Sequence, residues 1–173
     1  MTKFFISPGD PSGIGPEITL KALSKNKNIQ DNFILAGDKT LYLNLIDKNN
    51  IDLNLIDESS NEKGVIFKHF PLQNEVLLGE PDKANANYII DILSYGALGC
   101  LKNKFKGLIT GPINKELINE SGFEFSGHTE FLSDISNAKK VVMLLMNKKL
   151  KIALLTTHIP LSEVPSKIAK KNL

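Results

Sequence analysis

Two histidines occupy positions from which a side chain could take part in chemistry. His128 lies in Gly127-His128-Thr129-Glu130, which opens a helix-like segment, and Thr129 beside it could cap that helix or bind a ligand. His158 stands just past the carboxyl end of a predicted strand, where side chains often reach a site. An imidazole titrates near neutrality and can exchange a proton or bind a metal. Ordinary connections between strands and helices would contain the same residues, so chemistry alone leaves both interpretations open.

The stretch Gly107–Asp134 predicts a pocket for an anionic small molecule. Its apolar start runs into Thr110-Gly111-Pro112, and Pro112 suits the first position of a helix because its missing N–H costs nothing there. Gly122 suits the end of that helix. A strand that ends at a helix N-terminus presents free N–H groups and a positive dipole end to an anion, and Lys115 would add charge.

A second stretch rich in glycine and proline, Pro8–Glu17, follows the predicted strand Lys3–Ser7. Its glycines could let the backbone approach a ligand closely, and Pro16 would begin the next helix. No Gly-Lys-Ser/Thr follows, so the stretch is not a P-loop, and Gly13-Ile14-Gly15 lacks the third glycine of a dinucleotide fingerprint. A loop that only turns a strand into a helix explains the stretch as well.

Alternating strands and helices predict an α/β layered fold with antiparallel character near residues 141–157. The helix after Asp82 is expected to be the longest, with an apolar stripe from Ala86 to Leu101 at helical spacing. The other predicted helices are Ile18–Ser24, Lys39–Lys48 and Leu161–Lys170, the last capped by Ser162. The predicted strands are Lys3–Ser7, Phe33–Ala36, Ile51–Ile56, Val65–Phe70, Phe105–Ile109, Val141–Met146 and Lys151–Thr157.

The composition excludes some classes of function. The 173 residues are 42% apolar and 23% charged, with a formal charge of +2, which is typical of a globular domain. No cluster of Lys and Arg is interleaved with aromatic residues, so nucleic-acid binding has no support. The N-terminus has no signal-peptide core, and the apolar run Val141–Thr157 is too short and too interrupted by lysines to span a bilayer. Cys100 cannot form an internal disulfide, which fits a reducing, cytoplasmic location, and its apolar helical setting favours the core.

The sequence shows neither a complete metal site nor a nucleophile. A catalytic metal normally takes about three protein ligands, yet there is no HxH, HExxH or cysteine cluster. The third histidine, His69, is flanked by Lys68 and Phe70 and is expected at the surface. No serine lies in a nucleophile-elbow context. The residues alone therefore predict an α/β protein that binds an anionic small molecule, with no assigned catalytic residue.

Five motifs in order resemble the 4-hydroxythreonine-4-phosphate dehydrogenase family, which has the isocitrate/isopropylmalate dehydrogenase-like fold. The resemblance covers this chain from end to end but only the N-terminal half of the family protein. It implies a truncated α/β fold, with residues 1–125 in a first α/β domain that lacks its C-terminal return strands and residues 126–173 at the beginning of a second. The motifs are GDPSGIGPE (Gly9–Glu17), GEP (Gly79–Pro81), TGPINK (Thr110–Lys115), SGHTEFL (Ser126–Leu132) and TTHIPL (Thr156–Leu161).

The resemblance implies an enzyme of pyridoxal phosphate (pyridoxine) biosynthesis. Family members oxidise 4-phosphooxy-L-threonine with NAD, and loss of CO₂ then gives 3-amino-2-oxopropyl phosphate. A divalent metal, zinc, magnesium or cobalt, serves as a Lewis acid. By the resemblance, His128 and Thr129 bind the substrate, and His158 is one ligand of a metal site shared between the subunits of a homodimer. The cofactor-binding residues stay unassigned, although Gly9–Glu17 would border the cofactor cleft.

The resemblance also implies that this chain is an incomplete and inactive fragment. The remaining metal ligands and most cofactor-binding residues of the family would lie beyond Leu173. The expected ligand is a small phosphorylated hydroxy amino acid, and no nucleic acid or membrane partner is expected. Three alternatives stay open: a paralogous dehydrogenase of another phosphorylated hydroxy acid or a dihydrodiol, a phosphate acyltransferase-like protein, and a non-catalytic interaction module.

Overall fold

The computed structural model describes residues 3–157 and 159–168, which form two compact units divided between Ser136 and Asn137. These units are defined by contacts within this chain, and the domain division predicted at residues 125 and 126 stays a prediction. His158, the predicted metal ligand, lies outside the described residues. In the described parts of the chain, no helix combines the length and apolar character needed to cross a bilayer.

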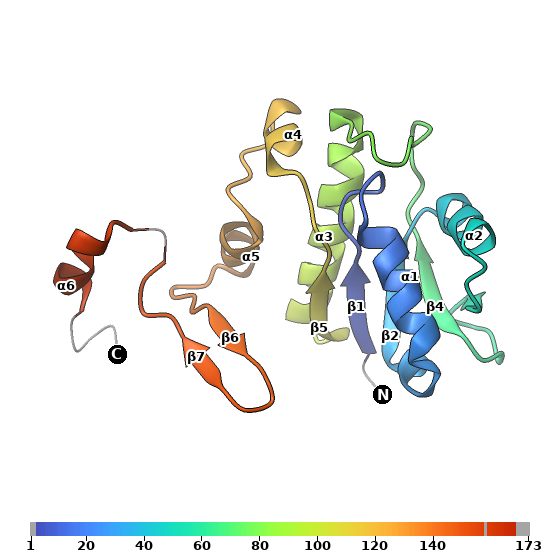
Figure 1. Cartoon of the computed structure of the whole chain (residues 1–173), viewed down its shortest axis with the longest axis horizontal. Coiled ribbons are helices and arrows are strands. Elements are labelled where there is room, and N and C mark those ends of the chain that lie inside the picture. The colour runs from blue at the N-terminus through green and yellow to red at the C-terminus, as the bar shows by residue number, and fades with distance from the viewer. Residues whose placement is uncertain (1–2, 158, 169–173) are drawn as a thin grey trace. The chain divides into compact units, whose positions relative to one another are not determined.

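A five-stranded parallel sheet forms the centre of the first unit, in the order β3-β4-β2-β1-β5 (Figure 1). Phe5 of β1 stands opposite Ile34 of β2 and Leu108 of β5. Short apolar runs form the inner strands because a parallel sheet is covered on both faces. The strands are β1 (Lys3–Ser7), β2 (Phe33–Gly37), β3 (Leu55–Ile56), β4 (Val65–His69) and β5 (Phe105–Thr110).

Helices cover both faces of this sheet, as the alternation of side chains along β1 requires. Ile6 packs with the buried side chains of α1 and α2, whereas its neighbour Phe5 packs with Ile92 of α3. The α3 helix also contacts α5 on its outer side. The helices of the first unit are α1 (Gly15–Lys25), α2 (Lys39–Lys48), α3 (Ala86–Leu101), α4 (Lys115–Glu120) and α5 (His128–Ser136), with the 3₁₀ segments η1 (Lys27–Asn32) and η2 (Lys83–Asn85).

The second unit contains the predicted antiparallel hairpin, made of β6 (Leu144–Met146) and β7 (Lys151–Ala153). Both strands are shorter than the predicted Val141–Met146 and Lys151–Thr157. The Asn147 side chain closes the turn by accepting hydrogen bonds from the N–H groups of Lys149 (2.8 Å) and Leu150 (2.9 Å). The predicted helix from Leu161 is broken into a 3₁₀ segment, η3 (Leu161–Glu163), and α6 (Val164–Lys167). Ser162 is therefore not the cap, and the last predicted helical residues lie outside the described ones.

Two predictions about the first unit were wrong in position. Only Leu55 and Ile56 of the predicted strand Ile51–Ile56 pair with β4. Ile51 does not join the sheet, because its N–H donates to the carbonyl of Ile46 in α2 (2.9 Å). The helix predicted to begin at Pro112 begins at Lys115, and Asn114 caps it by accepting from the N–H groups of residues 116 and 117. Residues 111–114 have no regular secondary structure, and the Gly111 N–H and the Pro112 carbonyl are hydrogen-bonded to the loop after β1.

Candidate functional site

The segment after β5 is tied to the loop after β1 by two backbone hydrogen bonds. The Gly111 N–H donates to the Ser7 carbonyl (2.7 Å), and the Asp10 N–H donates to the Pro112 carbonyl (3.1 Å). Parallel neighbouring strands end at the same edge of a sheet, so these loops emerge side by side. The hydrogen bonds also explain why no helix begins at Pro112: its carbonyl is used by the neighbouring loop.

Close backbone contact accounts for three glycines of these motifs. Gly9 has a φ of +90°, and a Cβ built on it would lie 2.1 Å from the Pro112 carbonyl oxygen. Cβ atoms on Gly15 and Gly111 would each lie 1.9 Å from the Pro8 carbonyl oxygen. In the structure these glycines make room for neighbouring backbone, which bulkier residues would force apart. The predicted approach of the Pro8–Glu17 glycines to a ligand stays a prediction.

Asp10 is a buried carboxylate that fixes the loop from inside, and the sequence analysis did not single it out. Its side chain is 6% exposed, and its Oδ1 accepts hydrogen bonds from the Ser12 N–H (2.9 Å) and from the Ser12 hydroxyl (2.7 Å). The Asp10 carbonyl accepts from the Gly13 N–H (3.1 Å). The sequence Asp10-Pro11-Ser12-Gly13 is typical of a turn and could have predicted these hydrogen bonds within the loop.

The motif Gly79–Pro81 lies far along the chain but is hydrogen-bonded to the loop after β1. The Gly79 N–H donates to the Ser12 carbonyl (2.7 Å). The Ser121 hydroxyl at the end of α4 donates to the Lys83 carbonyl in η2 (2.9 Å). Three of the five motifs and α4 therefore lie together beyond the carboxyl ends of β1 and β5, at the upper end of the sheet in Figure 1.

His128 and Thr129 are the first two residues of α5. The His128 ring is half-buried and meets the Phe125 ring edge-on, with centroids 6.0 Å apart. Burial lowers the pKa of His128, so the imidazole is neutral at pH 7 and offers one donor and one acceptor nitrogen. Thr129 is exposed, and its hydroxyl is accessible to a ligand.

Asn119 of α4 positions the turn that leads to His128. Its Oδ1 accepts from the Phe125 N–H (2.7 Å), and its Nδ2 donates to the Phe125 carbonyl (3.1 Å). Phe125 is buried against α3 and supports the His128 ring. A side-chain amide that pairs with both backbone groups of one residue holds that residue in a single orientation.

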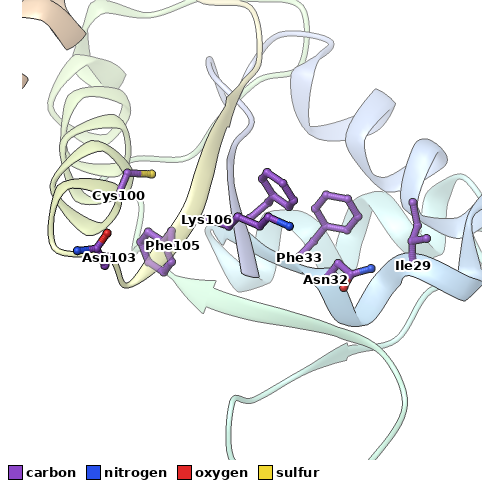
Figure 2. A pocket seen from close by; sticks show the side chains of 8 residues that line it. Ile29, Asn32, Phe33, Cys100, Asn103, Phe105 and Lys106 are labelled. Carbon is purple, nitrogen blue, oxygen red and sulfur yellow. The ribbon is translucent and has the colours of Figure 1, made fainter. Parts of the chain in front are cut away.

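His69 and Cys100, which the sequence analysis also considered, have contacts that fit a structural role. His69 is exposed at the end of β4, where its Nδ1 accepts from the Lys39 N–H (3.1 Å). Cys100 is half-buried, and burial raises the pKa of its thiol. It lines a cavity of about 740 Å³ at the amino ends of the strands (Figure 2), away from the loops that carry the motifs. Cavity size alone therefore does not mark the candidate site.

The described residues do not hold a complete metal site. Within residues 3–157 and 159–168, no group of three or more His, Cys, Asp or Glu side chains is placed to bind a metal. The predicted metal ligand His158 lies outside the described residues, and its role stays a prediction.

The first unit is a parallel α/β structure in which the loops after β1 and β5 are joined by backbone hydrogen bonds at the carboxyl ends of their strands. The family described as "Pyridoxal phosphate biosynthetic protein PdxA" matches residues 28–173, and the chain belongs to this family. The 4-hydroxythreonine-4-phosphate dehydrogenase of Sulfurihydrogenibium sp. is 40% identical over an alignment of 177 positions, which covers 100% of this chain and 55% of the relative. That of Vibrio parahaemolyticus is 35% identical over 99% of this chain and 53% of the relative.

A solved structure agrees with these sequence relatives. The structure described as a putative 4-hydroxythreonine-4-phosphate dehydrogenase from Salmonella typhimurium is 26% identical, with a TM-score of 0.85 over 99% of this chain and 56% of that chain. The chain thus spans about half the length of the relatives it matches.

Proposed function

We propose that this chain supplies part of a 4-hydroxythreonine-4-phosphate dehydrogenase of pyridoxal phosphate biosynthesis. The observation that carries the proposal is the set of backbone hydrogen bonds at the carboxyl ends of β1 and β5. These bonds join three of the motifs, Gly9–Glu17, Gly79–Pro81 and Thr110–Lys115. Family membership and the names of the relatives support a dehydrogenase. The full isocitrate/isopropylmalate dehydrogenase-like architecture, with its second domain, is part of the proposal.

The proposed reaction is the NAD-dependent oxidation of 4-phosphooxy-L-threonine, followed by loss of CO₂ to give 3-amino-2-oxopropyl phosphate. His128 and Thr129 are the proposed substrate-binding residues. The neutral imidazole can donate to or accept from a polar group of the substrate, and the Thr129 hydroxyl can do both. The Phe125–Asn119 contacts hold the imidazole in place, and this lowers the entropy lost when substrate binds.

His158 is the proposed contribution of this chain to a divalent metal site. Neutral imidazole suits zinc and cobalt, whereas magnesium prefers oxygen ligands. When bound, the metal would supply Lewis-acid chemistry at the substrate alcohol. Because the described residues lack a full ligand set, the proposal places the other ligands outside this chain and the site between two subunits of a homodimer in the cytoplasm.

A complementation assay tests this function. The purified chain is incubated with 4-phosphooxy-L-threonine, NAD and zinc, magnesium or cobalt, with and without the portion of the Vibrio parahaemolyticus relative that it does not match. We expect NADH formation in the complemented sample alone. His128→Ala and Thr129→Val should then raise the KM, whereas His69→Gln, which changes an exposed histidine, should not.

Three outcomes of the assay contradict the proposal in different ways. Turnover by the isolated chain would show that it is not an inactive fragment. A complemented enzyme that oxidises another phosphorylated hydroxy acid or a dihydrodiol, and not 4-phosphooxy-L-threonine, would identify a paralogous dehydrogenase. Acyl transfer to phosphate without any need for NAD would favour the acyltransferase alternative.

A further inference from the structure

A polar cavity of about 280 Å³ lies on the face of the sheet that α3 covers. Its floor is apolar, because Ile34, Ile66 and Phe105 line it and pack in the same cluster as Ile92 of α3. The polar and charged side chains of its lining are those of Asp57, Glu58, Lys68, His69, Tyr95 and Lys104. None of the lining residues belongs to the five motifs, so the proposed reaction gives this cavity no role.

Tyr95 of α3 can present its hydroxyl to this cavity as a hydrogen-bond donor. Its ring is held by three aromatic neighbours, with centroid distances of 5.4 Å to Phe5, 5.4 Å to Phe70 and 5.8 Å to Phe105. The hydroxyl oxygen accepts a hydrogen bond from Nζ of Lys104 (2.9 Å). Because an ammonium group can only donate, this bond does not use the hydroxyl proton of Tyr95, and the hydroxyl can donate that proton to a ligand.

Two lysines from different parts of the chain lie beside the Tyr95 ring. Nζ of Lys68 on β4 is 5.6 Å from the ring centroid, and Nζ of Lys104, which precedes β5, is 5.3 Å from it. The hydrogen bond to Tyr95 raises the pKa of Lys104, so its side chain is charged at pH 7. These aromatic contacts restrain both ammonium groups, which lowers the entropy that is lost when a ligand binds them.

His69 adds a further donor at the carboxyl end of β4. Its side chain lines the same cavity, and its Nδ1 accepts the backbone N–H of Lys39 (3.1 Å). A histidine ring whose Nδ1 is an acceptor carries its proton on Nε2, so Nε2 is a donor. The cavity therefore brings together donors from β4, from α3 and from the turn before β5.

Two carboxylates also line the cavity, but they do not cancel its positive charge. Asp57 is paired with Lys39, with 3.8 Å between its Oδ1 and the lysine Nζ. The charge of Glu58 acts on Lys104 and contributes to its raised pKa. Within the lining that the structure describes, Lys68 and Lys104 are thus balanced by Glu58 alone, and the cavity carries an excess of positive charge.

We propose that this cavity binds the phosphate group of a small phosphorylated molecule, with Lys68, Lys104 and Tyr95 as the principal donors. A phosphate monoester carries about two negative charges at pH 7 and has three strong acceptor oxygens. Two ammonium groups match this charge. Separate donors from three elements suit a tetrahedral group, whereas a planar carboxylate is matched best by the flat fork of arginine. This inference concerns a second site, and it holds or fails independently of the proposed reaction.

NMR of the isotopically labelled full chain tests the proposal through its histidine rings. His69 reports on the cavity, and His128 reports on the candidate substrate site. The probes are inorganic phosphate and O-phospho-L-threonine, each compared with sodium chloride at the same ionic strength. We expect saturable shifts of the His69 ring signals with both probes. O-phospho-L-threonine should bind more tightly, because the cavity has room beside the phosphate group.

Substitutions separate the proposed donors from the other cations of the surface. Lys68→Gln and Lys104→Gln should each weaken binding by about tenfold, because each removes a charge-assisted hydrogen bond. Tyr95→Phe keeps the ring but removes the hydroxyl, and it should weaken binding by about threefold. Lys106→Gln is the matched control and should have no effect, because Lys106 also lies over an aromatic ring, that of Phe4 (5.5 Å), but does not line this cavity. Glu58→Gln should tighten binding, because it removes a carboxylate that competes with the ligand.

Several results would overturn the proposal. One is a His69 shift that chloride reproduces or that does not saturate with phosphate, in a chain that circular dichroism shows to be folded. Another is equal weakening by Lys106→Gln, which would indicate a general effect of surface charge. A shift of the His128 signals alone would assign phosphate to the candidate substrate site and not to this cavity. Tighter binding of inorganic phosphate than of O-phospho-L-threonine would contradict the proposed class of ligand.

Discussion

Gly79 donates its backbone N–H to the carbonyl oxygen of Ser12 at 2.7 Å, and this hydrogen bond joins two motifs that lie far apart in the sequence. Ser12 is itself held by the Asp10 carboxylate, and the Asp10 N–H is held by Pro112. The loops around the candidate site therefore form one connected network, and a change in any of them should be felt by the others.

Removal of the Asp10 carboxylate should destabilise the fold. Asp10→Ala leaves the buried N–H and hydroxyl of Ser12 without their acceptor, and we expect a loss of about 1–3 kcal/mol in the free energy of unfolding. Asp10→Asn keeps an oxygen in the same place and should lose less. Urea unfolding of the three proteins measures the difference, and an alanine variant as stable as the asparagine variant would argue against this role.

Alanine substitutions at Gly9 and Gly122 distinguish the cost of steric overlap from the cost of backbone strain. Both have positive φ, +90° and +91°, but a Cβ on Gly9 would overlap the Pro112 carbonyl, whereas a Cβ on Gly122 meets nothing within 4 Å. We expect Gly122→Ala to cost about 1 kcal/mol of unfolding free energy through strain alone, and Gly9→Ala to cost about 2–4 kcal/mol. Equal losses in denaturant titrations would show that contact with Pro112 is unimportant.

Tyr42, which is buried, and Tyr88, which is partly buried, should respond in opposite ways to loss of their hydroxyls. Among the described residues, the Tyr42 hydroxyl has no hydrogen-bond partner, and a buried group of this kind costs free energy. Tyr42→Phe should therefore stabilise the protein by about 1 kcal/mol. Tyr88→Phe should destabilise it by about 1 kcal/mol, because the Tyr88 hydroxyl accepts from the Asp38 N–H (3.0 Å). Thermal unfolding compares them, and destabilisation by Tyr42→Phe would indicate a bound water.

His128 should make the fold less stable in mild acid. Burial lowers its pKa below the ordinary 6.5, so below that pH the unfolded chain binds more protons than the folded chain at this site. Stability should be retained above about pH 6.5 and should fall as the pH drops from there toward the folded pKa. His128→Gln should flatten this part of the stability curve. An NMR titration that places the His128 pKa at or above 6.5 would contradict the prediction.

The sequence by itself determined the elements whose side-chain pattern is local. The apolar run Lys3–Ser7 and the periodic segment Lys39–Lys48 have the bounds predicted for them, and the hairpin around Asn147 follows from a turn between two apolar runs. Propensity and periodicity act over a few residues, so these elements can be predicted without knowledge of the segments that they pack against. The five motifs likewise predicted the family from sequence alone, and the match of the family to residues 28–173 confirmed it.

Only the tertiary structure decided how the motifs are used. Pro112 does not begin a helix, because a neighbouring loop takes its carbonyl, and Ile51 does not continue a strand, because its N–H turns back to α2. The glycines after β1 and β5 serve backbone contact, and Asp10 holds the loop from inside. The contacts of Ile51 and Asp10 are with residues close in the sequence, whereas those of Pro112, Gly9 and Gly111 are with partners that are distant in the sequence. Local pattern carries no information about such partners, because the hydrogen bonds exist only once the parallel strands have paired.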